Sequence, residues 1–224
     1  MIDIGNIYVE GFSPAIEGMR NPLNSWDKSD SEYIVHDYVA SDKMIDRYEV
    51  AEVGPADMDL MKRLFNAGTE HRKFMRFIDV WMTVKAPIYW WKEADTYHFM
   101  DRNSCSTMHT ITKKWFEMTD FAVEHLNGEA IPAMNKMIWT LNRLREEWFE
   151  AEGDRKKEIW YSIIQLLPSS YLQQSTIKFN YETAANIYRQ RKNHKLDEWH
   201  IFCDTLECLP YFKDITGIGG DLHG

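Results

Sequence analysis

The sequence predicts an α+β fold in which helices flank a small, mostly antiparallel sheet. Apolar residues make up 44% of the 224 residues, which is enough for a substantial core. Short runs rich in β-branched and aromatic residues, typical of strands, occur among longer runs with the i, i+3, i+4 spacing of helices. Because the two kinds of run do not alternate regularly, a parallel sheet built from βαβ units is not expected.

The composition narrows the class of protein. Acidic residues outnumber basic ones by 35 to 26, giving a net charge of −9, which argues against a nucleic-acid polymer as partner. No apolar run approaches the roughly 18 residues of a membrane-spanning helix. The 3 cysteines form no CxxC pair, so neither a disulfide framework nor a zinc or other metal site is expected. The first residues lack the pattern of a signal peptide, and we expect a cytoplasmic protein.

The N-terminal part is expected to be an extension before the main domain. Residues 1–30 contain Gly, Pro, Asn and Ser breakers and are predicted to be irregular. Residues 32–40 are rich in strand-forming residues and predict a short strand. We therefore place the extension at residues 1–50, the main α+β domain at 51–215 and a Gly-rich tail at 216–224.

The first half of the main domain is predicted to hold a helix, a strand and a second helix. Residues 54–68 begin with Pro55 in the first turn and end at Gly68, as a helix does. Residues 74–84 contain no breaker and predict a strand, and Pro87 suits the first turn of the next helix. The buried face of the strand is expected to comprise Phe74, Ile78, Val80, Met82 and Val84, and one side of the helix Trp90, Trp91, Ala94, Tyr97 and His98.

The second half is predicted to hold a helical hairpin, a strand and two further helices. Residues 132–153 and 155–168 each repeat apolar residues at helical spacing, and a Glu-Gly-Asp break separates them, which indicates two antiparallel helices. A strand is expected at residues 174–180, and helices at 181–191 and 196–209.

One cysteine is a candidate nucleophile. Residues 101–106, "DRNSCS", are expected to form a loop that leads into a helix, and a helix N-terminus could lower the pKa of Cys105. His98 or His109 could act as its base. Most free cysteines simply pack, however, and aromatic residues such as those of this region are more often core than the wall of a cofactor site. Taken alone, these residues do not identify the reaction that the protein catalyses.

Two segments together resemble a known family. The first, "FNAGTEHRKFMRFIDVWMTVKAPIYWWKEADTYHFMDRNSCSTMH", follows the pattern G-H-x-[ST]-x-x-E-H, then A-P-[IL]-[FY], then R-H-R-x-x-S-x-N-E-x-S-x-R-Y. The second, "LPSSYLQQSTIKFNYETAANIYRQR", follows L-P, a strand and an N-x-R helix that ends in L-R. In it, Asn180 and Arg191 keep the expected separation. The chain thereby resembles a divergent member of the flavin-dependent thymidylate synthases (ThyX, or thymidylate synthase-complementing, family) over residues 58–110 and 166–208.

The resemblance implies a homotetramer in nucleotide biosynthesis, with FAD and dUMP, or a related pyrimidine nucleotide, bound at subunit junctions. Reduced flavin would deliver a hydride while a methylene group passes from a folate to C5 of uracil. By position, the flavin-binding residues would be His71, Thr96, Tyr97, His98 and Asn180. The nucleotide-binding residues would be Lys92, Glu93, Asn103, Ser104, Ser106 and Arg191, of which Ser106 and Arg191 would be catalytic.

Several positions depart from the family pattern. Thr96–His98 stand in place of R-H-R, and Ser104 and Met108 replace the Glu and Arg of N-E-x-S-x-R. Glu182 replaces the Arg of N-x-R, and Phe77 the His of E-H. Bidentate arginines are strong phosphate ligands, so a catalytically inactive ThyX-fold protein that binds a nucleotide or a partner is the second hypothesis. A transferase with a cysteine nucleophile is the third. The cations that could compensate are Lys92, Arg76, Arg102 and Arg191.

Overall fold

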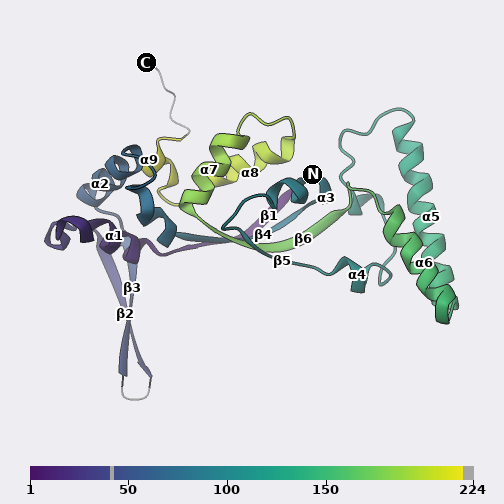
Figure 1. Cartoon of the computed structure of the whole chain (residues 1–224), viewed down its shortest axis with the longest axis horizontal. Coiled ribbons are helices and arrows are strands. Elements are labelled where there is room, and N and C mark those ends of the chain that lie inside the picture. The colour runs from purple at the N-terminus through teal and green to yellow at the C-terminus, as the bar shows by residue number, and fades with distance from the viewer. Residues whose placement is uncertain (41–42, 219–224) are drawn as a thin grey trace. The chain divides into compact units, whose positions relative to one another are not determined.

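The computed structural model describes residues 1–40 and 43–218, and Figure 1 shows the succession of helices and strands. A four-stranded antiparallel sheet has the order β1-β4-β6-β5, and a second sheet pairs β2 with β3 in antiparallel register. The predicted α+β class with a mostly antiparallel sheet and flanking helices is therefore confirmed. The strands are β1 (Asp3–Glu10), β2 (Glu32–Ala40), β3 (Lys43–Glu52), β4 (Asp79–Pro87), β5 (Asp101–Ser104) and β6 (Leu172–Asn180).

Contacts within the chain divide it into two compact units, which are described separately. Unit 1 comprises Met1–Gly5, Thr83–Thr96 and Arg102–Thr176, and unit 2 comprises Asn6–Met82, Tyr97–Asp101 and the chain from Ile177 onward. The division at residues 1–50, 51–215 and 216–224 stays a prediction, and residues 219–224 of the tail lie outside the described residues.

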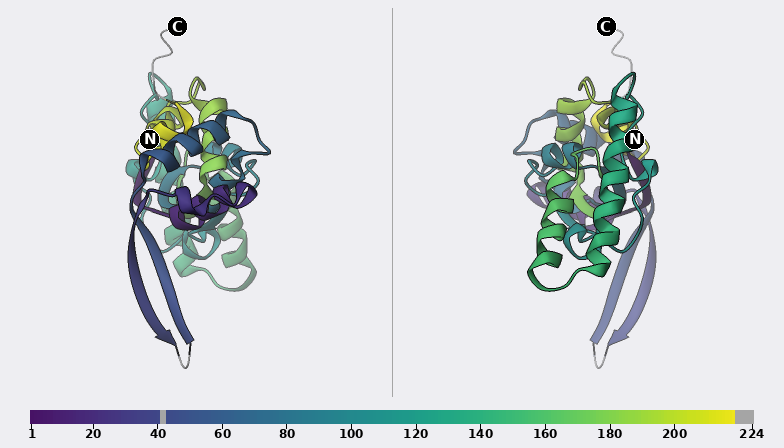
Figure 2. Two further views of the ribbon diagram at one scale, coloured as in Figure 1. Left: turned by 90° about the vertical axis from the view of Figure 1, so that its left-hand side faces the viewer. Right: turned by 90° about the vertical axis from the view of Figure 1, so that its right-hand side faces the viewer.

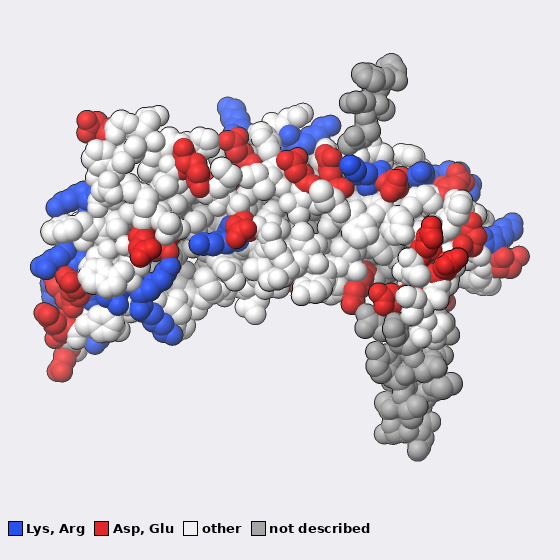
Figure 3. Space-filling view, turned by 180° about the vertical axis from the view of Figure 1, so that it is seen from behind, with Lys and Arg blue, Asp and Glu red and all other residues white. Residues whose placement is uncertain are grey.

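The helical hairpin of unit 1 is confirmed. Helices α5 (Ala130–Glu150) and α6 (Gly153–Leu166) lie side by side in Figures 1 and 2, and Leu141, Ile159 and Ile163 on their facing sides are buried. Acidic and basic side chains are interspersed over these helices, at the left of Figure 3, as in an exposed amphipathic pair. Unit 1 also contains the short helices α3 (Ile88–Ala94) and α4 (Thr107–Thr110) and the 3₁₀ turn η4 (Met118–Asp120).

The helices of unit 2 include the one predicted at 181–191, which has those bounds as α7 (Tyr181–Arg191). The core of unit 2 is aromatic. Trp199 and Phe202 are fully buried, and the ring centres of Phe202 and of Phe179 on β6 are 6.1 Å apart. Within the described ranges, no helix is long and apolar enough to cross a bilayer. The other helices are α1 (Phe12–Arg20), α2 (Pro55–Asn66), α8 (Asp197–Glu207) and α9 (Phe212–Thr216), with 3₁₀ turns η1 (Asn21–Leu23), η2 (Trp26–Lys28) and η3 (Arg72–Phe77).

The prediction that residues 1–30 are irregular is wrong. Strand β1 takes up the first edge of the larger sheet, and α1 follows it. Tertiary pairing here overrides the local breakers. Gly11 between the two elements has φ +103°, and a Cβ there would lie 1.8 Å from the carbonyl oxygen of Phe77. The glycine is therefore a requirement of the tight turn from strand to helix rather than a sign of disorder.

Three other boundaries differ from the predictions. The strand predicted at 74–84 begins only at Asp79, because the residues before it form η3, although its predicted apolar face is buried throughout. Helix α3 ends at Ala94, so Tyr97 and His98 do not lie on it; Thr96 closes its end by donating from Oγ1 to the Glu93 carbonyl at 2.6 Å. The predicted loop at 101–106 is largely strand β5, which forms an edge beside β6 and tolerates polar residues there.

Candidate functional site

Unit 1 contains an open cleft of about 570 Å³ at the β4, β6 and β5 strands, which we call the strand cleft. Lys85 comes from β4, Gln174 and Thr176 from the central strand β6, and Asn103 and Ser104 from the end of β5. Its volume is in the range of about 300–1,000 Å³ typical of small-ligand sites. The remaining lining residues are Cys105, Thr110, Lys114, Asp120, Tyr171, Leu172 and Ser175.

Backbone hydrogen bonds hold the polar end of β5 against β6. The N–H of Cys105 donates to the Gln174 carbonyl at 2.9 Å, and the Cys105 carbonyl accepts from Nε2 of Gln173 at 3.1 Å. Gln174 and Thr176 are exposed whereas Ser175 between them is buried, as the period of two in a strand requires. The cleft is thus floored by alternate polar side chains of one sheet face.

The charges of the strand cleft are few and partly neutralised. Lys114 forms an ion pair with Asp120, whose other carboxylate oxygen accepts the N–H of Glu117 at 3.0 Å. Burial, together with the charge of Asp120 and the nearby Cys105 thiol, raises the pKa of Tyr171 to about 12. Tyr171 therefore stays a neutral hydrogen-bond donor at physiological pH. Lys85 is half-buried and forms no ion pair with any residue in the described ranges.

The adjacent tryptophans belong to the core of unit 1 and not to the cleft. Trp90 and Trp91 are at most 2% exposed, and Nε1 of Trp91 donates to the Gln173 carbonyl at 3.0 Å. The guanidinium of Arg102 lies 4.6 Å from the centre of the Trp91 ring and pairs with Asp95 at 3.1 Å. Arg102 thus already has a countercharge.

In unit 2, two predicted ligand residues touch each other. Nε of Arg191, at the end of α7, donates to the hydroxyl oxygen of Tyr97 at 2.8 Å, and that hydroxyl donates to Gln190 Oε1 at 3.1 Å. The guanidinium also lies 4.7 Å from the centre of the Trp199 ring, within the range of a cation–π contact. These contacts fix the direction of the Arg191 side chain at the end of α7.

A cavity of about 340 Å³ in unit 2 includes another predicted residue, Asn180. The Asn180 side chain accepts the N–H of Thr183 at 3.0 Å and so caps α7. Phe99 lines the same cavity; it is 82% exposed and has φ +68°, an uncommon conformation for a bulky residue. Its other lining residues are Arg76, Asp79, Asp101, Lys178 and Phe179.

Two residues of unit 2 that depart from the sequence pattern have opposite charges and pair with each other. Arg76 and Glu182 form an ion pair, and Glu182 holds the pKa of Arg76 above its usual value. Arg76 occupies the Glu position of the E-H motif, just before Phe77, and Glu182 occupies the Arg position of N-x-R. The two charges are exchanged relative to the motif, so opposite signs are kept at this pair of positions.

The other predicted residues lie outside these cavities. Lys92 is exposed on α3, and His71 and His98 are exposed in unit 2. Ser106 directly precedes α4 as its N-cap residue and does not line the strand cleft. The roles predicted for the site residues stay predictions. The structure places the consecutive residues Asn103 and Ser104 at the strand cleft of unit 1 and brings Tyr97 and Arg191 together in unit 2.

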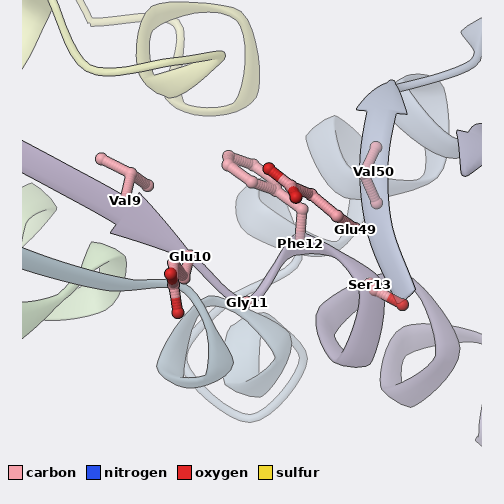
Figure 4. Close-up of a pocket in the computed structure, with 7 residues that line it drawn as sticks. All are labelled: Val9, Glu10, Gly11, Phe12, Ser13, Glu49 and Val50. Carbon is pink, nitrogen blue, oxygen red and sulfur yellow. The ribbon is translucent and has the colours of Figure 1, made fainter. Parts of the chain in front are cut away.

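A third cavity, shown in Figure 4, is formed by the turn from β1 to α1 and by β3. Its volume of about 120 Å³ is too small for a nucleotide or a flavin. Phe12 at its edge packs against Tyr181 and Tyr211 at ring distances of 5.7 and 5.4 Å. The cavity is therefore not the candidate site.

Sequence reasoning missed several residues of the strand cleft. Lys85 stands within the "KAPIY" segment and Gln174 within a predicted strand, so period-two alternation could have placed both on one sheet face. Tyr171 had no local signal, because an isolated bridge between Phe121 and Tyr171 brings distant segments together. Lys114 lies in an irregular segment and Asp120 in the short turn η4, which no spacing rule predicts.

Comparison with known proteins gives a match in fold. No protein-family model matches the chain, and no curated protein matches it in sequence. The ThyX of Helicobacter pylori, solved with FAD and dUMP, aligns with a TM-score of 0.67 at 15% identity, over 96% of this chain and 97% of that chain. The UMP/dUMP methylase PolB of Streptomyces cacaoi, bound with 5-Br dUMP, aligns with a TM-score of 0.58 at 11% identity, over 92% of this chain and 88% of that chain. The chain therefore has the ThyX fold.

Proposed function

We propose that this protein is a divergent ThyX-like enzyme that methylates a pyrimidine nucleotide, dUMP or a close relative, at C5. The observation that carries the proposal is the fold match, which extends over 96% of the chain to an enzyme solved with FAD and dUMP. The similarity to a UMP/dUMP methylase supports the same substrate class. The proposed enzyme is a cytoplasmic homotetramer that takes its methylene group from a folate.

Several residues suit a bound flavin. FAD would supply a hydride from its reduced form, and the protein would supply position and electrostatics. The guanidinium of Arg191, which the Tyr97 hydroxyl orients through Nε, could donate to acceptor atoms of a bound ligand. His71, His98 and Thr96 are exposed and could contact the cofactor without breaking a buried network.

In the proposed reaction, residues of this chain bind and orient the nucleotide. Asn103 and Ser104 present an amide and a hydroxyl at the strand cleft, groups that can donate and accept hydrogen bonds. The neutral Tyr171 phenol adds a donor that keeps its proton at neutral pH. Such an array can recognise the carbonyl and N–H groups of a pyrimidine.

The proposal is tested by product formation. Purified protein is incubated with dUMP, FAD, a methylene-folate and dithionite as reductant, and the nucleotide is analysed by mass spectrometry. We expect a product heavier by one methylene group, formed only when both flavin and folate are present. Unchanged dUMP, together with failure to rescue a thymidine-requiring bacterial strain, would contradict the proposal.

A nucleotide-binding protein without catalysis is the second candidate. It is favoured by one observation, the replacement of R-H-R by Thr96–His98, which removes two positive charges from the predicted flavin and nucleotide site. This candidate predicts that dUMP binds with measurable affinity while the reaction mixture above gives no product. Turnover excludes it.

A further inference from the structure

The strand cleft carries an uncompensated positive charge. Its charged lining side chains are Lys85, Lys114 and Asp120. Because Lys114 and Asp120 form an ion pair, the ammonium group of Lys85 remains as the net charge of the cleft. Lys85 is half-buried on β4, where the lower local dielectric makes its interaction with an anion stronger than in open water.

Neutral hydrogen-bonding groups surround this charge. Besides Asn103, Ser104 and Tyr171, which are proposed above to recognise the pyrimidine, the amide of Gln174 and the hydroxyl of Thr176 line the same cleft. A tetrahedral oxyanion accepts several hydrogen bonds at once, and a lysine serves it as a point charge among such donors. The lining chemistry thus fits a phosphate group.

Two of the cations that the sequence pattern offered for a phosphate already form ion pairs. Arg76 pairs with Glu182, and Arg102 pairs with Asp95. Lys92 is exposed on α3 and does not line the cleft. Lys85 remains as a lysine of the cleft that forms no ion pair in the described ranges, although it also lines an adjoining cavity of about 430 Å³ with Asp3 and Glu124.

We propose that the strand cleft is a phosphomonoester subsite in which Lys85 is the principal cation. The subsite would hold the 5′-phosphate of the pyrimidine nucleotide and would replace the arginines that this chain lacks at Thr96 and Met108. The identification of the bound phosphate as that of a nucleotide rests on the proposed function. The existence of an anion site at Lys85 is independent of the proposed function.

The test is calorimetric titration of the full chain with three probes: dUMP, deoxyuridine and inorganic phosphate. For the wild-type protein we expect dUMP to bind at least about 10-fold more tightly than deoxyuridine, and inorganic phosphate to compete with dUMP. Lys85→Gln should weaken dUMP binding by about 10- to 100-fold, the loss of one hydrogen-bonded charge contact, and leave deoxyuridine binding unchanged. Lys85→Arg should keep most of the affinity.

The matched control is Lys136→Gln, which removes the same charge from an exposed position on α5, over the ring of Trp139. We expect dUMP affinity to change less than about 2-fold, because Lys136 does not line the strand cleft and an exposed charge is screened by salt. Equal affinities of Lys85→Gln and Lys136→Gln would overturn the inference. If Lys85→Gln does not fold, equal wild-type affinities for dUMP and deoxyuridine, with no competition by phosphate, overturn it instead.

The titrations distinguish failure of the phosphate subsite from failure of the proposed enzyme activity. Lys85-dependent dUMP binding without flavin binding or product would support the subsite while the proposed enzyme fails. Product formation with unchanged dUMP affinity in Lys85→Gln would support the enzyme while the subsite fails.

Discussion

Replacing Asp57 by alanine should destabilise the protein strongly. Asp57 on α2 is fully buried, and its carboxylate accepts hydrogen bonds from Arg20 Nε at 2.6 Å and from the hydroxyls of Ser29 and Ser31 at 2.7 and 2.6 Å. Arg20 on α1 is only 4% exposed, so the variant leaves a buried guanidinium without its countercharge. Removing one partner of a buried ion pair costs about 3–5 kcal/mol, which lowers the melting temperature by roughly 10 °C for a chain of this size.

The matched control is Asp59→Ala on the same helix. Asp59 also pairs with an arginine, Arg63 at 2.9 Å, but its side chain is 67% exposed and that of Arg63 is 68% exposed. An exposed pair of this kind contributes about 0.5 kcal/mol or less. Both variants are measured by thermal unfolding at neutral pH. Melting temperatures of the two variants within about 2 °C of each other would refute the reasoning.

The same network predicts a pH dependence. Burial of Asp57 opposes its ionisation, but hydrogen bonds from Ser31 and Ser29 and the charge of Arg20 outweigh this and hold the pKa of the carboxyl below its usual value. Because the folded-state pKa of Asp57 is depressed, its ionised carboxylate stabilises the fold at pH values above the unfolded-state pKa of about 4. This contribution is lost as the pH falls through the folded-state pKa and the carboxylate is protonated. The melting-temperature difference between wild type and Asp57→Ala should therefore shrink below pH 4, and a difference that grows there would contradict the assignment.

Three further predictions concern the candidate site. Tyr97→Phe removes the hydroxyl that accepts a hydrogen bond from Arg191. We expect nucleotide affinity to fall about 3- to 10-fold while the circular dichroism spectrum shows an intact fold. Unchanged affinity would count against Arg191 as a ligand. Glu182→Arg alone should lower the melting temperature by placing like charges together, and Arg76→Glu in the same chain should restore it; additive losses would disprove the exchanged pair. Cys105→Ala should keep full turnover, whereas loss of activity with dUMP binding retained would indicate a thiol nucleophile.

The sequence predicted best those elements whose stabilising contacts are local or periodic. The helix at 181–191 and the strand at 32–40 were placed at their observed bounds, and the hairpin of α5 and α6 follows from helical spacing and a Glu-Gly-Asp break. In these segments propensity, spacing and end signals agree. β1 was missed because pairing with β4 holds it as a strand, and no local signal shows that pairing.

Sequence reasoning placed residues at the observed cavities only where a motif of the resembled family fixed their position, and their roles stay predictions. Asn103 and Ser104 line the strand cleft, and Tyr97 contacts Arg191, although these pairs were placed by resemblance and not by local chemistry. Lys114 and Asp120 pair across a short irregular segment, where neither helical nor strand spacing predicts which side chains meet. The adjacent tryptophans form the core of unit 1, which is the place that the sequence analysis favoured for such large aromatic residues.

The central claim is that this ThyX-fold protein uses a flavin. The most direct measurement is the visible absorption spectrum of the purified chain before and after titration with FAD, followed by addition of dUMP. We predict a flavin band near 450 nm that is retained through gel filtration at about one FAD per chain, and a further spectral change when dUMP binds beside the flavin. Colourless protein from whose fractions added FAD separates completely would contradict the claim.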